Sequence, residues 1–512
     1  FNICFVELNQ NLFPPVNFLP MTSTLWKNTS LAVKRDSAAF VWNNEGVLEF
    51  LPKGSGNRQA GRLDWSPREQ CTNTYEVGGT AAFPFKALAY AKPEVPDILI
   101  EPQSTNYASD LLSQYTQVGS NISISTNSNN TATIAFDGLI DPQGRQYAQA
   151  IYASSSTTGY WEDGVIGQTQ MPKGWSHSLF VKTNKNYTYD ASSSTTQQLG
   201  APAVFIRCID KTGKSYGVRF NFVTKEIKEI GLTAAGGANN ASRFFVQTLK
   251  NGWYRIGYDV DDSLETGNFE DPKYQFGFWD DISNQPGVNT TGGASALLFG
   301  HQVEICQRQR IHTSLIYNNT TSAVTRVAET IGNPATSGLG AIFNQVTNGG
   351  IFHLRFKFLS PTSKGASYRQ MGLNTSLGGS GSQNNFFGIN IGTNNQLHAV
   401  ARTSGSNQYF FSKTTTDEER NNKYFSVASF FKRNYGQMWV NGAQVGSTDN
   451  SVNQIGFTKN QISINFNIQF ATSQFYGRIN EINYYTGSEI TIAEGREICE
   501  EITTNHNKVS PL

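Results

Sequence analysis

Short stretches in which apolar and polar residues alternate recur along most of the chain. Residues 203–209 and 216–222 alternate or stay apolar, and residues 180–182 repeat the pattern. A period of two places successive side chains on opposite faces of a β-strand. The pairs Asn251-Gly252 and Asn441-Gly442 follow or precede such stretches, and Asn-Gly is favoured in tight hairpin turns. The pattern therefore predicts many short strands joined by hairpins.

A helical period is clear at one place, near the end of the sequence. Residues 491–502 put Ile498 and Ile502 on one face and Glu and Arg side chains on the other. An apolar stripe of this kind is typical of an amphipathic helix that packs on a core. We therefore expect one short C-terminal helix.

Strands at short, regular spacing with turn signals between them are typical of β-sandwiches and barrels. We predict an all-β protein in which an N-terminal β-rich attachment segment precedes two jelly-roll β-sandwich domains, followed by the short helix. Shifts in composition place joins near residues 120–133, between Cys306 and Thr336, and after Asn505. The expected units are an extended arm (1–34), an N-terminal β segment (35–118), two sandwiches (119–325 and 326–505) and a tail (506–512).

The composition fits a globular protein with a neutral, polar surface. Charged residues make up 15% of the 512 residues, while 12% are aromatic, including 34 Phe. The formal net charge is +1, and basic residues form no run of five or more, so we expect no nucleic-acid partner. No stretch approaches the ~20 apolar residues of a membrane helix, and residues 1–19 lack a basic leader. Neither membrane insertion nor a signal peptide is therefore expected.

The cysteines are few, odd in number and widely separated. A disulfide framework is not expected from such a set, which fits folding in a reducing cytosol. The five positions are Cys4, Cys71, Cys208, Cys306 and Cys499.

Three groups of motifs resemble modules of bacteriophage tail and appendage proteins. The first group is RDSAA (35–39), LDW (63–65) and ILIEPQSTN (98–106). This order resembles the phage pattern in which an Arg-Asp strand and an aromatic-Asp strand precede "LLIEPQxTN". The resemblance implies an N-terminal segment that attaches or assembles the subunit.

The second group is KNGWYRI (250–256), ASALLFGHQVE (294–304) and SAVTR (322–326). It is similar to the carbohydrate-binding-like sandwich of phage proteins, with its "NGWYR", "GxQxE" and "VTR" motifs. From the residues alone, Trp253 and Tyr254 after a tight turn can anchor a core, and Gln302 and Glu304 share one face of a strand.

The third group lies within residues 336–505, which resemble a concanavalin A-like (laminin-G-like) jelly roll. The motif QMWVNGAQVG (437–446) looks like a hairpin of that family, and FYGRINEINYY (475–485) looks like its closing strand before the terminal helix.

Catalytic motifs are not convincing in this sequence. Jelly-roll glycanases carry carboxylates at alternate strand positions facing one cleft, and this pattern does not occur in the third module. Asp259 and Asp261 do alternate in the second module. They have three readings: solvated acids at a strand end, a calcium site or catalytic groups. The six histidines show no metal-ligand spacing. We expect no enzyme activity and no cofactor, with calcium as a possibility left open at Asp259 and Asp261.

Aromatic side chains give the glycan-binding hypothesis its candidates, because rings face pyranose CH surfaces while amides and carboxylates bond the hydroxyls. Core or interface packing is the competing reading for each ring. The glycine-rich stretch 378–385 could line a rim or simply connect strands. The candidates are Tyr160, Trp161 and Trp175 in the second module and Tyr409, Phe410 and Trp439 in the third.

The resemblances together imply a structural protein of a bacteriophage virion, namely a tail or head fibre or a capsid decoration subunit. Host attachment through surface glycans, a homotrimeric state, contacts with other virion proteins through the N-terminal region, and assembly in the host cytoplasm are its expected properties. Two alternatives stay open: a secreted bacterial lectin or adhesin, and a polysaccharide depolymerase.

Overall fold

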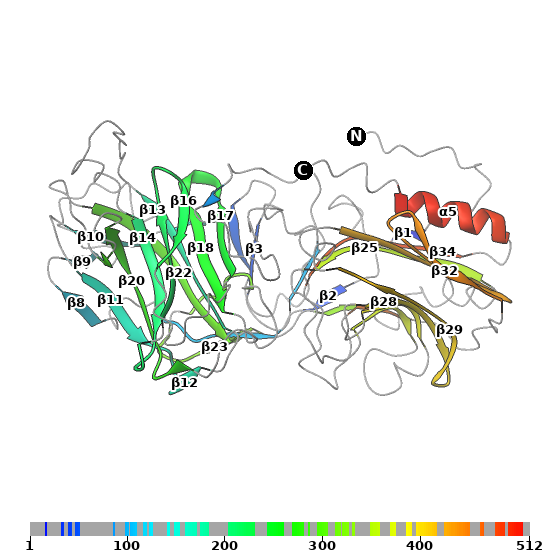
Figure 1. Cartoon of the computed structure of the whole chain (residues 1–512), viewed down its shortest axis with the longest axis horizontal. Helices are drawn as coiled ribbons and strands as arrows, with labels where there is room; N and C mark the ends of the chain where they lie inside the picture. The colour runs from blue at the N-terminus through cyan, green and yellow to red at the C-terminus, as the bar shows by residue number, and fades with distance from the viewer. Residues whose placement is uncertain are drawn as a thin grey trace.

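The computed structural model confirms an all-β protein with one short C-terminal helix. It describes residues 16–17, 32–34, 39–42, 47–51, 85–87, 98–101, 103–109, 116–119, 122–125, 141–143, 148–153, 159–171, 175–183, 203–213, 215–230, 243–260, 269–280, 285–286, 294–305, 313–318, 320–326, 330–332, 349–358, 369–374, 386–391, 396–416, 424–450, 461–464, 477–486 and 490–504. Two β-sandwiches lie side by side (Figure 1).

The middle sandwich consists of two antiparallel sheets. The β13 sheet has the order β17 (Arg243–Thr248), β18 (Tyr254–Val260), β13 (Trp175–Thr183), β22 (Ala294–Ile305), β10 (Gln149–Ala153) and β9 (Ile122–Ser125), with β7 (Ser104–Asn106) and β23 (Val324–Arg326) attached. The β14 sheet has the order β5 (Phe85–Lys86), β16 (Glu226–Glu229), β15 (Ser215–Asn221), β14 (Ala203–Ile209), β20 (Lys273–Asp280), β11 (Gly159–Gly164) and β8 (Thr116–Gly119), with β21 (Gln285–Pro286) attached.

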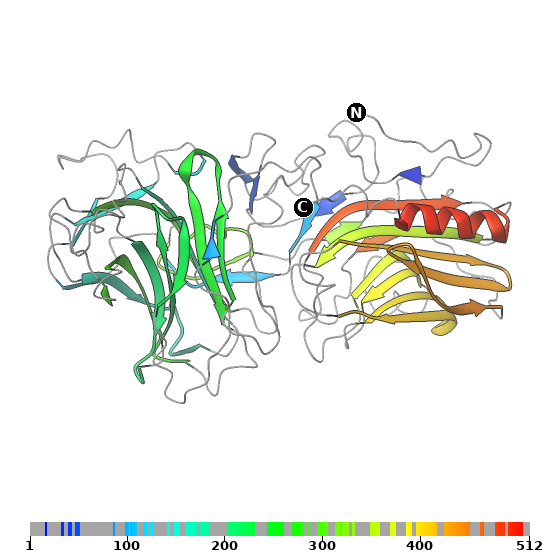
Figure 2. The same cartoon turned by 45° about the horizontal axis from the view of Figure 1, so that its top comes forward.

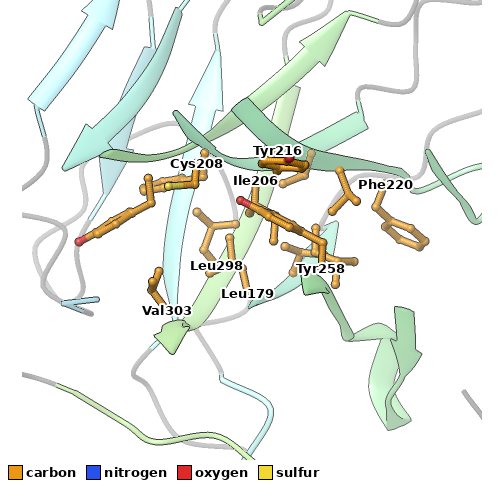
Figure 3. Close-up of a cluster of buried hydrophobic side chains, with 14 of the residues drawn as sticks. Leu179, Ile206, Cys208, Tyr216, Phe220, Tyr258, Leu298 and Val303 are labelled. Atoms are coloured by element: carbon orange, nitrogen blue, oxygen red, sulfur yellow. The ribbon is translucent and has the colours of Figure 1, made fainter. Parts of the chain in front are cut away.

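The core of the middle sandwich is filled from both of these sheets (Figure 3). Leu179 and Leu298 come from the β13 sheet, whereas Ile206 and Phe220 come from the β14 sheet. The alternation in residues 203–209 and 216–222 explains this, because every second side chain reaches the core. Two small pairs complete the module: β12 (Gln170–Met171) with β19 (Phe269–Glu270), and β3 (Ala39–Trp42) with β4 (Leu48–Leu51). A 3-10 turn, η3 (Lys250–Gly252), precedes β18.

The C-terminal sandwich also has two antiparallel sheets. The β25 sheet has the order β1 (Val16–Asn17), β34 (Gly477–Thr486), β25 (Gly349–Phe358), β30 (Tyr424–Lys432), β31 (Tyr435–Val440) and β32 (Ala443–Asp449), with β6 (Ile98–Ile100) attached to β34. The β27 sheet has the order β2 (Ala32–Lys34), β24 (Thr330–Gly332), β33 (Gln461–Ile464), β26 (Arg369–Asn374), β27 (Phe386–Ile391), β28 (Gln396–Thr403) and β29 (Ser406–Thr414).

The helix α5 (Ile492–Thr504) lies along the outer face of the β25 sheet, so this half of the molecule has three layers (Figure 2). Ile498 and Cys499 of α5 pack with Phe430 and Trp439 of the sheet. On the inner face, Phe387 meets Phe431 edge to face at 4.5 Å, which joins the two sheets. The apolar stripe read from the sequence therefore covers a sheet face.

Strands from the N-terminal part of the chain belong to both sandwiches. The strand β7 pairs with β22 and β23 in the middle sandwich, whereas β6, a few residues earlier, pairs with β34 in the C-terminal sandwich. The residues from 1 to 15, the motif at 63–65, the stretch at 378–385 and the tail from 506 lie outside the described residues. Within the described residues, no helix has the length and apolar character needed to cross a membrane.

Candidate functional site

Motifs from three distant parts of the sequence meet in one buried polar cluster beside β22. The Glu101 carboxylate forms an ion pair with Arg326 at 3.0 Å, and both side chains are fully buried. Ser314 links them, because its backbone N–H and hydroxyl donate to Glu101 at 2.5 and 2.6 Å while its hydroxyl oxygen accepts from Arg326 at 2.8 Å. The "EPQxTN" and "VTR" motifs are therefore in direct contact through Glu101 and Arg326.

Glu304 belongs to the same cluster. Its carboxylate accepts the backbone N–H of Thr313 at 3.0 Å, the hydroxyl of Thr313 at 2.6 Å and the hydroxyl of Ser104. Asn106 completes the joint by accepting the backbone N–H of Val303 at 3.0 Å and donating to two backbone carbonyls. Because buried charges are costly unless paired and hydrogen-bonded, this arrangement is that of a structural joint.

A cleft open to solvent lies elsewhere, at the edge of the C-terminal sandwich. It has a volume of about 680 Å³ and is bounded by β29, the last strand of the β27 sheet, and β32, the last strand of the β25 sheet. Its lining combines apolar side chains with hydroxyl, amide and carboxylate side chains. The lining residues are Phe410, Phe411, Ser412, Val445, Gly446, Ser447, Thr448, Asp449 and Asn450.

Phe410 is the aromatic side chain at the mouth of this cleft. The alternation along β29 turns Tyr409 and Phe411 into the sandwich and Phe410 outward, where 43% of its surface is exposed. His398 supports the ring from β28, with the two ring centroids 4.6 Å apart. Burial lowers the pKa of His398 to about 4, so this imidazole is neutral at pH 7. The cleft therefore presents an uncharged aromatic platform beside polar groups.

Three of the six predicted glycan contacts are core residues in the structure. Trp175 packs among Tyr216, Tyr258 and Phe269 in the middle sandwich. Tyr409 lies between the sheets of the C-terminal sandwich, and its hydroxyl is 2.6 Å from the Ser429 hydroxyl. Trp439 lies under α5. Burial puts these three rings out of reach of a surface ligand.

Tyr160 and Trp161 lie on opposite faces of β11 in the middle sandwich. Trp161 packs against the inner core, whereas Tyr160 packs on a small outer cluster with Phe205 and Trp279. Both rings keep part of their surface exposed. They are far in sequence and in sheet from Phe410, so the structure does not gather the predicted aromatic residues into one site.

The calcium prediction at Asp259 and Asp261 falls where the structure gives no side-chain description. Asp259 has a described backbone, which pairs with Ser176 and Arg243, and Asp261 lies outside the described residues. Among the described residues, no group of three or more His, Cys, Asp or Glu is placed to hold a metal ion.

Sequence reasoning missed the β32 side of the cleft. Ser447, Thr448 and Asn450 sit in an ordinary polar stretch, and nothing in that stretch indicates that it faces β29. Only the arrangement of the two sheets brings these side chains to Phe410.

Comparison with known proteins gives no family. No family model matches the chain, and no curated protein matches it. Binding domains of botulinum neurotoxins are among the solved structures that align with part of it. The binding domain of botulinum neurotoxin DC in complex with rat synaptotagmin II is 11% identical, with a TM-score of 0.26 over 34% of this chain and 40% of that chain.

A second aligned structure is of botulinum neurotoxin type C, whose cell entry depends upon interaction with two ganglioside molecules. It is 13% identical, with a TM-score of 0.27 over 36% of this chain and 40% of that chain. The alignments thus span about two fifths of the neurotoxin chains. At this identity and TM-score they support no inference about the ligand of this chain.

Proposed function

We propose that the protein is a non-enzymatic structural component of a bacteriophage particle, a fibre or decoration subunit, that binds host-surface glycans in the β29–β32 cleft. The observation that carries the glycan proposal is the outward ring of Phe410 beside a rim of hydroxyl, amide and carboxylate side chains. Sugars stack their CH faces on aromatic rings, and small polar groups fix their hydroxyls.

The edges of the two sheets add to this support. Within the described part of the chain, β29 pairs with β28 alone and β32 with β31 alone. Each strand therefore turns one backbone edge away from its own sheet. Backbone N–H and C=O groups at such an edge are strong hydrogen-bonding partners, and sugar hydroxyls can use both donors and acceptors.

The virion part of the proposal rests on the motifs that resemble phage appendage proteins. Glu101, Glu304 and Arg326 come from three of these motifs and lie in one buried cluster. Residues that are far apart in sequence but share one buried cluster fold together. Their contact supports the interpretation of the three motifs as parts of one phage-type module. Location in the virion, assembly in the host cytoplasm and a homotrimeric state belong to this proposal.

Binding of saccharides to the Phe410→Ala variant tests the glycan proposal. We expect at least a tenfold loss of affinity for a host surface glycan, about 1.4 kcal/mol, because the stacking surface is removed. Ile492→Ala is a matched control, since Ile492 is a similarly exposed apolar side chain, at 41%, on α5. Isothermal titration calorimetry measures both. Equal binding by the wild type and Phe410→Ala would contradict the cleft assignment.

Three further measurements test the remaining parts. Light scattering should give a mass near three times 56.4 kDa, and a stable monomer would argue against a trimeric fibre. Release of reducing ends from host polysaccharide should stay at background, and measurable release would favour the depolymerase alternative. Detection of the chain by mass spectrometry in purified phage particles tests the virion assignment.

A further inference from the structure

The outer face of the β14 sheet carries an ordered row of polar side chains. Gln275 on β20 lies opposite Arg207 on β14 and opposite Glu162 on β11. The amide of Gln275 donates to Glu162 at 2.9 Å and accepts from the Arg207 Nε–H. Lys273 forms an ion pair with the same Glu162 at 3.2 Å. Arg207 is thus fixed in direction by a hydrogen-bonded chain across three strands.

Two aromatic rings lie close to the guanidinium. Arg207 lies 5.3 Å from the ring centroid of Tyr160 and 5.6 Å from that of Phe205. A second cation, Arg219, lies 5.5 Å from the ring centroid of Trp279. Stacking on rings holds a guanidinium flat and leaves its edge free to donate in the ring plane.

Gly217 makes room for this arrangement. It lies opposite Arg207 on β15, and a Cβ at Gly217 would come within 2.3 Å of the Arg207 Cβ. Because Gly217 has no side chain, the space above it is available to Arg207. The neighbouring residues on the inner face, Ile206 and Cys208, pack in the core, so Arg207 points outward by the two-residue alternation.

The charges of this face are predominantly positive. Among the described residues on the outward rows, Lys273 is paired with Glu162 and Lys228 with Glu226. Arg207 and Arg219 lie on the same rows, so the described basic side chains outnumber the described carboxylates. Tyr160, Arg207 and Arg219 are partly exposed. An anion that approaches the face therefore meets positive charge and an accessible ring.

We propose that this face, with Arg207 at its centre, binds the carboxylate of an acidic saccharide, and that Tyr160 stacks against the sugar ring. A guanidinium holds a carboxylate through two parallel N–H donors, which sets direction as well as affinity. The inference rests on the proposed glycan-binding function and adds a second site with a different ligand class. The Phe410 cleft takes neutral sugar surfaces, whereas the Arg207 face takes a charged one.

Titration with a defined pair of ligands tests this site. The probes are an oligosaccharide of alternating glucuronate and N-acetylglucosamine and the same oligosaccharide after its carboxyl groups have been reduced to alcohols. We expect the full chain to bind the acidic form at least tenfold more tightly, with an affinity that falls as salt rises. Equal affinity for the two forms would overturn the proposal, and so would no binding of the acidic form at millimolar concentration.

Variants at Arg207 and Tyr160 test the site, with Ile492→Ala as the control. Arg207→Gln should lower affinity for the acidic form at least tenfold. Arg207→Lys should give an intermediate affinity because lysine keeps the charge but lacks the two parallel N–H donors. Ile492→Ala, on α5 of the other sandwich, should leave acidic binding unchanged. If Arg207→Gln lowers the melting temperature, Tyr160→Ala at the exposed ring replaces it. Unchanged acidic binding in both Arg207→Gln and Tyr160→Ala would refute the site while leaving the cleft proposal intact.

Discussion

Two histidines meet inside the core of the middle sandwich. His177 on β13 and His301 on β22 bring their Nε2 atoms to 2.5 Å, and the Nδ1 of His177 lies 3.1 Å from the Tyr258 hydroxyl. Both imidazoles are buried. Burial lowers the pKa of His301 to about 3 and holds the pKa of His177 well below its usual value. The pair is therefore neutral at pH 7, with one ring donating and the other accepting.

This pair should make the free energy of unfolding depend on pH. In the unfolded chain a histidine titrates near 6.5, so between that value and about 3 the unfolded state binds more protons than the folded state. The stabilisation is present above pH 6.5 and is lost as pH falls. At pH 4 we expect His301 to account for a loss of about 3 kcal/mol.

Urea denaturation at several pH values between 8 and 4 measures this loss. The His301→Gln variant removes one titrating group, and the difference between wild type and variant cancels the contribution of His398 and other groups. A difference that stays constant across this pH range would contradict the assignment of the loss to His301.

For single residues, the sequence predicts which of them lie in strands but not which residues they contact in the folded protein. His301 stands in the "GHQ" motif and was readable as a strand residue. Its contact with His177 depends on the pairing of β13 with β22, where a register shift follows Ser178. The same limit applies to Trp175, because an aromatic residue in an alternating stretch fits a core and a binding face equally well until the sheet is known.

The helix α5 has clear local signals at its start. Thr491 and Glu494 form a capping box: the backbone N–H of Glu494 donates to the Thr491 hydroxyl at 3.2 Å, and the Thr491 backbone N–H donates to the Glu494 carboxylate at 2.8 Å. These hydrogen bonds lower the pKa of Glu494. They satisfy donors that a helix start otherwise leaves free.

Gly495 in the first turns of α5 should resist replacement by alanine. Alanine normally stabilises a helix interior by roughly 0.5–1 kcal/mol relative to glycine. A Cβ at Gly495, however, would meet the Phe430 ring at 2.3 Å. We expect Gly495→Ala to destabilise the C-terminal sandwich by about 1–3 kcal/mol.

Chemical denaturation measures the effect of Gly495→Ala, and Glu497→Ala on the exposed face of α5 is the matched control. A gain of stability in Gly495→Ala, equal to that of the control or larger, would mean that α5 does not approach the β25 sheet so closely.

Periodicity was sufficient to predict α5 but could not explain its glycine. The stripe of Ile498 and Ile502 is visible in the sequence, and both residues pack toward the sheet in the structure. Glycine inside a helix reads only as a weak position until Phe430, 65 residues earlier in the chain, is seen against it. Strands were predicted for the same local reason, whereas their order in four sheets depends on distant contacts.

At the scale of the whole molecule, consecutive described strands lie in different sandwiches at four places: β2 and β3, β5 and β6, β6 and β7, and β23 and β24. The last two of these crossings lie close together. The buried ion pair of Glu101 and Arg326 joins them at 3.0 Å. Glu101 directly follows β6 of the C-terminal sandwich, and Arg326 is the last residue of β23 in the middle sandwich. The ion pair is therefore part of the joint that orients the two sandwiches.

Loss of the Glu101 charge should therefore be costly. Glu101→Gln leaves Arg326 buried without a counter-charge, which we expect to lower the free energy of unfolding by about 3–5 kcal/mol. Glu270→Gln is the matched control, since its ion pair with Lys211 at 2.9 Å is exposed and such pairs contribute about 0–1 kcal/mol.

Urea denaturation compares the two variants, and small-angle X-ray scattering shows whether the two sandwiches keep their mutual orientation. We expect a larger radius of gyration for Glu101→Gln alone. Similar stability and scattering for both variants would mean that the ion pair does not hold the joint.

The brevity of the crossings from β6 to β7 and from β23 to β24 limits how the molecule responds to tension. Three residues separate β6 from β7, and three separate β23 from β24. At roughly 3.3–3.6 Å for each extended residue, neither segment can lengthen beyond about 10 Å before a strand must peel from its sheet. A pulling force on one sandwich is therefore transmitted to the other with almost no extension of the connecting segments.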